Sequence, residues 1–115
     1  MDDDDRPPYF YILGEDHVPE RVHDVVTWGE AFGTMNRRVA FDEVAPGVTV
    51  STVFLAIDHA MGFGPPELFE TMVFDNDDDE EMERYATWDE AVAGHQRMVE
   101  RVRERLRAHE SSMDR

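Results

Sequence analysis

The sequence contains no cysteine and no lysine. The absence of cysteine excludes disulfide bonds, thiol nucleophiles and thiolate metal ligands. No apolar run approaches the roughly 20 residues that a membrane-spanning helix needs. The first residues, MDDDDRPP, are acidic where a secretion signal would be basic and then apolar. We therefore expect a cytoplasmic protein that is not associated with a membrane.

All 11 basic residues are arginine, and 27 acidic residues outnumber them, so that the formal net charge is −16. Direct binding to nucleic acid is disfavoured, because neutralising phosphate groups requires a basic patch. Two explanations of the acidity stay open. One is a GC-rich coding genome or a salt-adapted host, and the other is a surface that presents carboxylates to a basic partner, as a nucleic-acid mimic does.

The length of 115 residues corresponds to one domain, and hydrophobic residues make up 41% of the chain. This fraction is sufficient for a globular core. We predict an acidic flexible tail over residues 1–8, a single domain over 9–110 and a C-terminal tail over 111–115.

Runs of β-branched, aromatic and alternating residues predict strands, and apolar stripes with a repeat of three to four residues predict helices. The stretch 15–26 carries a proline and mixed polarity, which indicates an irregular or extended connection. The order β-α-β-β-β-β-α predicts an α+β fold with an antiparallel sheet of about five strands, a short helix and a long C-terminal helix. The predicted strands are 8–13, 37–44, 48–58, 67–74 and 82–86, and the helices follow threonines at 27 and 87.

The segments TWGEA and TWDEA share all but one residue and begin 60 positions apart, at 27 and 87. Threonine followed three residues later by glutamate is the capping-box pattern, in which each side chain satisfies a free backbone N–H of the first helical turn. The alternative is a duplicated site that places two Glu and two Trp around one ligand. The residues after the two copies share no pattern, which favours capping. The predicted caps are Thr27 with Glu30 and Thr87 with Glu90.

Asp58 and His59 end the longest predicted strand, and Glu70 lies on the next one. If these strands pair, the three side chains come near one sheet edge, where they supply the residue types of a metal site or of acid–base catalysis. The alternative is structural. In that case Asp58 and His59 bond to the loop backbone, and Glu70 pairs with Arg38 or Arg84 across the sheet.

His95 follows Gly94 on the apolar stripe of the long helix. A histidine there is typical of a hydrogen-bonded core residue. Glycine inside a helix costs about 1 kcal/mol relative to alanine and usually indicates close packing. The acidic segment 75–81 lacks the glycine and the bidentate glutamate of an EF-hand loop. We predict no metal site and no cofactor.

Four blocks of the sequence are RRVA (37–40), VSTVFLAIDH (50–59), GPPELFETMVF (64–74) and ERYATWDEAVAGH (83–95). Together they resemble a family of small proteins of tailed phages and prophages, with the pattern STVFLGxDH, GPPxLFETMxF and ERYxTWxEAxxGH. The resemblance covers about residues 27–102, and Ala56 stands where the family pattern has glycine. It implies a mobile-element setting in a bacterial or archaeal host cell, in which small acidic accessory proteins act by binding a host protein. The matching blocks contain Asp58, His59, Glu70, Arg84 and His95.

We therefore favour a non-enzymatic accessory protein that binds a host or phage protein, with counter-defence or regulation as its role. One alternative is a small metal-dependent or acid–base enzyme that uses the Asp, His and Glu cluster. Another is a virion or assembly component, which would form a symmetric oligomer. The sequence does not predict the oligomeric state.

Overall fold

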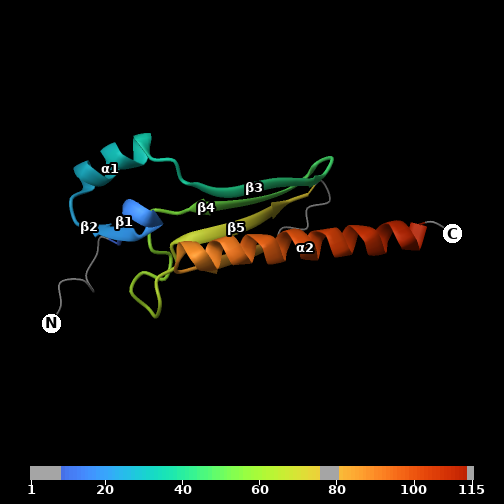
Figure 1. Cartoon of the computed structure of the whole chain (residues 1–115). Helices are drawn as coiled ribbons and strands as arrows, with labels where there is room; N and C mark the ends of the chain where they lie inside the picture. Colours follow the sequence, from blue (N-terminus) through green and yellow to red (C-terminus); the bar gives the residue numbers. More distant parts are fainter. Residues whose placement is uncertain (1–8, 76–80, 114–115) are drawn as a thin grey trace.

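The computed structural model describes residues 9–75 and 81–113, with side chains described as far as residue 110. Two antiparallel sheets and a long C-terminal helix form an α+β fold, as predicted (Figure 1). One sheet has two strands in the order β1-β2, and the other has four in the order β3-β4-β5-β6. The elements are β1 (Phe10–Leu13), η2 (Glu15–His17), β2 (Pro19–Val22), α1 (Val25–Thr34), β3 (Arg38–Ala45), β4 (Val48–Phe54), β5 (Phe69–Phe74), β6 (Met82–Tyr85) and α2 (Trp88–Met113).

Helix α2 packs on one face of the four-stranded sheet, and its C-terminal end projects past the strands (Figure 1). Every second residue of β4, from Val48 to Phe54, is buried on that face, as the alternating pattern requires. Val50 and Val73 meet Met98 and Val102 of the helix there. Strand β4 lies between β3 and β5 in this sheet.

The predicted first strand does not join the large sheet. It pairs instead with β2, which lies in the stretch predicted as an irregular or extended connection. This small sheet extends the end of β4, because the Tyr11 N–H donates to the Ala56 carbonyl at 2.8 Å and the Asp58 N–H donates to the Tyr9 carbonyl at 2.9 Å. The Trp28 indole of α1 also donates to the Ala56 carbonyl, at 3.1 Å.

The predicted cap at Thr27 is wrong, because α1 begins at Val25 and its N-cap is Asp24. The Asp24 carboxylate accepts hydrogen bonds from the Thr27 hydroxyl at 2.7 Å and from the Val26 N–H at 3.1 Å. These two bonds lower the pKa of Asp24. An aspartate earlier in the chain therefore caps the helix, and Thr27 lies within its first turn.

The second capping box is confirmed. The Glu90 N–H donates to the Thr87 hydroxyl, and the Thr87 N–H donates to the Glu90 carboxylate, both at 3.1 Å. Helix α2 then runs for 26 residues from Trp88. In the described part of the chain, no helix combines the length and the apolarity that spanning a membrane requires.

Ala56 has a backbone φ of +68° and is fully buried. This is the left-handed region, which costs a residue with a Cβ roughly 1–2 kcal/mol and which glycine adopts freely. Glycine at this position would avoid that cost.

Candidate functional site

Asp58 is buried, and its carboxylate closes the loop that follows β4. It accepts hydrogen bonds from the Ala60 N–H at 2.8 Å and from the Glu67 N–H at 2.9 Å. His59 beside it is exposed. Asp58 thus has the structural role that was the alternative in the sequence analysis.

Glu70 and Arg84 are register partners on β5 and β6, and the Arg84 Nε lies 3.0 Å from a Glu70 carboxylate oxygen. Arg84 also lies 3.9 Å from Glu67. Since Phe69 and Thr71 are buried under α2, Glu70 points to the opposite face of the sheet. Glu70 therefore pairs with Arg84 across the sheet, which is the structural alternative to a metal or acid–base role.

His95 lies on the α2 side of the sheet, away from Glu70. Its Nε2 donates to the Asp42 carboxylate at 2.7 Å, and its Nδ1 lies 2.7 Å from the Thr52 hydroxyl oxygen. The five candidate residues are therefore divided among three places: a loop with Asp58 and His59, a cross-strand pair, and a buried histidine.

The hydrogen bonds of His95 continue into a buried polar chain that the sequence analysis missed. The Tyr85 hydroxyl donates to the Thr71 hydroxyl at 3.1 Å, and the Thr71 and Thr52 hydroxyls lie 2.5 Å apart. With His95 carrying its proton on Nε2, the Tyr85 hydroxyl donates one bond, and each of the two threonine hydroxyls donates one and accepts one. The chain therefore runs in one direction from Tyr85 to Asp42 and leaves no member unsatisfied.

The order Asp42, His95, Thr52 has the composition of a hydrolase triad. However, Thr52, Thr71 and His95 are fully buried, so that no substrate reaches the hydroxyl that would act as the nucleophile. The Asp42 side chain is 46% exposed, whereas Tyr85 at the other end is only 8% exposed. Burial raises the pKa of Tyr85 at the other end. We interpret the chain as the contact that sets the position of α2 on the sheet.

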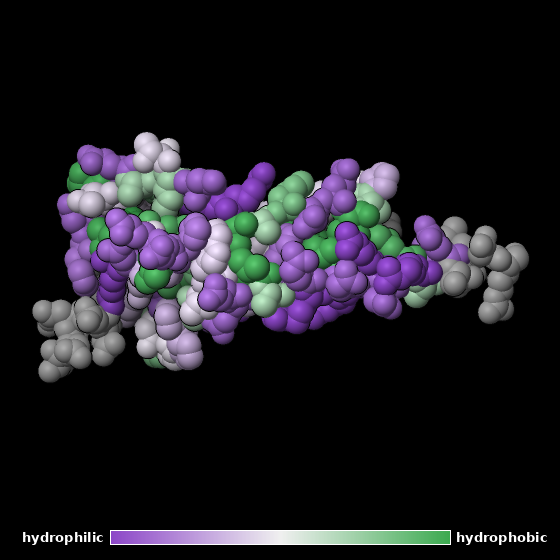
Figure 2. Space-filling view, in the orientation of Figure 1, coloured by the Kyte–Doolittle hydropathy of each residue, from purple (hydrophilic) through white to green (hydrophobic). Residues whose placement is uncertain are grey.

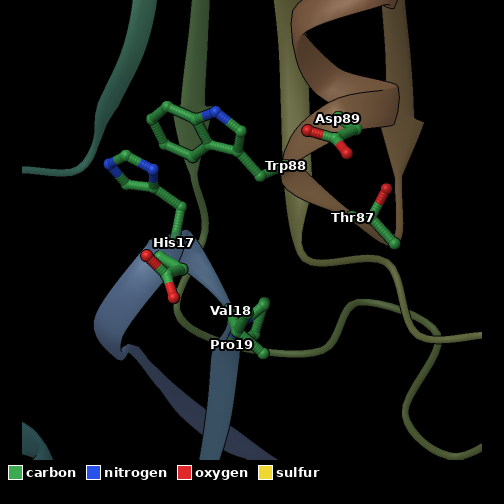
Figure 3. A pocket seen from close by; sticks show the side chains of 7 residues that line it. His17, Val18, Pro19, Thr87, Trp88 and Asp89 are labelled. Atoms are coloured by element: carbon green, nitrogen blue, oxygen red, sulfur yellow. The ribbon is translucent and has the colours of Figure 1, made fainter.

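A shallow cleft of about 170 Å³ lies beside Trp88, at the start of α2 (Figure 3). The His17 ring stacks on the Trp88 indole with the ring centroids 3.8 Å apart. Asp16 and His17 have positive φ values of 58° and 62°. The cleft is smaller than the ~300 Å³ at which small-molecule pockets begin. Its walls are Asp16, His17, Val18, Pro19, Thr87, Trp88 and Asp89.

Metal-ligating side chains do not gather in the described ranges, which hold no group of three or more His, Cys, Asp or Glu able to bind a metal ion. The acidic segment 75–81, which lacks the EF-hand pattern, lies largely outside these ranges, since residues 76–80 are not described.

The side of the four-stranded sheet opposite α2 carries a mixed apolar and charged surface, which we call the uncovered face. The register aligns its side chains in three rows across the strands. The middle row is Phe41, Ser51, Met72 and Met82. One flanking row is Arg38, Val53, Glu70 and Arg84, and the other is Glu43, Thr49 and Phe74.

Large apolar side chains of the uncovered face are open to solvent. Phe41 and Phe74 are each 47% exposed, and Met82 is 48% exposed. The Arg38 guanidinium lies over the Phe41 ring, 4.9 Å from its centroid. On the side shown in Figure 2, the hydrophobic side chains form separate groups among hydrophilic ones.

The fold and these surfaces define a small acidic α+β protein with a buried polar chain and an uncovered sheet face. No protein-family model, no curated protein and no solved structure matches the chain.

Proposed function

We propose that this is a small accessory protein of the tailed-phage or prophage type that acts by binding another protein molecule through the uncovered face. The observation that carries the proposal is the exposure of Phe41, Phe74 and Met82 on one face. Burying such a side chain fully contributes about 1.5–3 kcal/mol, so covering the exposed half of each contributes roughly 1 kcal/mol.

The composition of the uncovered face supports a protein partner. Phe, Met and Arg are among the residue types enriched in protein interfaces, and Lys, Glu and Asp are depleted there. The face contains two Phe, two Met and two Arg, and one of its two Glu is already paired with Arg84. The enzyme hypothesis has less support, because its Asp, His and Glu residues do not converge.

The test is site-specific photo-crosslinking in cells that naturally express the protein. A photoreactive phenylalanine analogue replaces Phe41 in one variant and Gln96 in the control, since Gln96 is exposed on α2. We expect position 41 to form a discrete protein adduct, position 96 to form none, and Met72→Glu to abolish the adduct at position 41. Equal labelling at the two positions, or none at position 41, would contradict the proposal.

A further inference from the structure

We infer that the partner at the uncovered face is a second copy of this chain, packed sheet against sheet about a two-fold axis that runs along the middle row. The inference rests on the proposed function and names the occupant of the same surface. Charge balance, the symmetry of the rows and the extent of the face carry it.

The uncovered face is electrically balanced within an acidic protein. Its charged residues are Arg38, Arg84, Glu43 and Glu70, which cancel, whereas the whole chain carries −16. A surface built for a basic partner would be acidic. A surface that meets its own copy must avoid a net charge, because every charge would face a field of its own sign. The balance therefore favours a second copy over a basic partner.

The three rows are complementary to themselves under this two-fold operation. An axis along the middle row places that apolar row on its counterpart and exchanges the two flanking rows, as an isologous interface requires. Arg38 of one copy then faces Glu43 of the other, twice in each dimer. Both side chains are exposed, and neither forms an ion pair among the described residues, whereas Glu70 and Arg84 already pair with each other.

The extent of the face indicates a weak dimer. Four strands about 4.8 Å apart, with rows about 6.8 Å apart, give a patch of roughly 20 Å by 20 Å. Two such patches give roughly 800 Å², which is below the ~1,200–2,000 Å² that stable interfaces bury in total. The net charge of each copy adds a repulsion that salt screens. We therefore expect a monomer–dimer equilibrium that depends on protein concentration and strengthens with salt.

Sedimentation equilibrium of the full chain at about 0.15 M salt, where the Debye length is about 8 Å, tests the inference. The wild-type mass should rise with concentration from 13.3 kDa towards twice that value. F41E should stay monomeric. R38E and E43R should each weaken dimerisation at least about tenfold, because each sets like charges against each other. The double reversal R38E/E43R restores opposite charges and should return the dissociation constant to within about threefold of wild type. Circular dichroism confirms that each variant is folded.

A wild-type protein that stays monomeric at every concentration overturns the inference. So does a dimer that F41E leaves intact, or a double reversal as weak as either single one. The proposed function fails separately. If the chain is monomeric but position 41 crosslinks a protein of another mass, the proposed binding through the uncovered face stands, and the inference that the partner is a second copy is wrong. If position 41 forms no adduct at all, both are wrong.

Discussion

Replacing Gly94 by alanine should destabilise the protein, although alanine is the better helix former. Gly94 is buried in α2, and a methyl group at this position would overlap the ring and the hydroxyl of Tyr85. Tyr85 is itself only 8% exposed, and its hydroxyl donates to Thr71. It therefore has little room to move without breaking the end of the polar chain.

Three contributions decide the magnitude. Alanine gains about 1 kcal/mol over glycine in a helix interior. Overpacking a well-packed core costs about 1–3 kcal/mol. Displacing the ring also removes the Tyr85–Thr71 hydrogen bond, which is worth about 1 kcal/mol. The expected result is a net loss of about 1–3 kcal/mol, and each kcal/mol lowers the melting temperature by roughly 3–8 °C in a domain of this size.

Thermal and urea unfolding followed by circular dichroism measure this loss. The matched control is the same Gly94→Ala change in a Tyr85→Leu background, where the atoms that the methyl group would overlap are gone. There the change should stabilise by up to about 1 kcal/mol, since only the helix preference remains. A stabilising Gly94→Ala in the wild type, or an equal loss in both backgrounds, would refute the packing argument.

Four further outcomes follow from the structure. Thr87→Ala should lower the free energy of unfolding by about 1 kcal/mol, and Thr27→Ala by less than about 0.5 kcal/mol, because only Thr87 is an N-cap; equal losses in urea unfolding would contradict this assignment. His95→Leu leaves a buried hydroxyl without its acceptor and should cost about 1–3 kcal/mol in the same assay; a loss below about 0.5 kcal/mol would be inconsistent with the polar chain. Ala56→Gly should change stability by less than about 1 kcal/mol, because relief of the left-handed strain offsets the lost methyl burial, whereas Ala56→Val should cost more than about 2 kcal/mol; similar melting temperatures for these two variants would argue against the strain. Burial raises the pKa of Tyr85 above its ordinary 10.0, so the stability that the neutral Tyr85 phenol contributes is complete below pH 10.0 and is lost as the pH rises further. Absorbance at 295 nm should show a late phenolate step that Tyr85→Phe removes. An unchanged titration in that variant would contradict the burial.

Much of the fold could be predicted from local patterns. The run VTVSTVFL predicts a central strand because few other elements tolerate so many β-branched residues. Thr87 and Glu90 predict the start of α2 because a capping box needs only local contacts. Strand β2 could not be predicted in this way. Its sequence PERV begins with proline and carries two charges, and it becomes a strand because it pairs with β1.

The buried polar chain was harder to predict, because it depends on which strand residues share a face. Thr52 and Thr71 resemble ordinary solvent-facing threonines in the sequence, and Asp42 resembles a surface carboxylate. One signal was present: Thr52 alternates in step with Val50 and Phe54, which places its hydroxyl on the buried face. The partners of His95 became visible only once the sheet register had brought β3 and β4 together under the helix.

The most direct test of the central claim is the ratio of photo-crosslinked protein obtained from position 41 to that obtained from position 96. Binding through the uncovered face predicts a discrete adduct at position 41, near twice the chain mass if the partner is a second copy, that Met72→Glu removes. An absence of adducts at position 41, or equal adducts at both positions, would contradict the account.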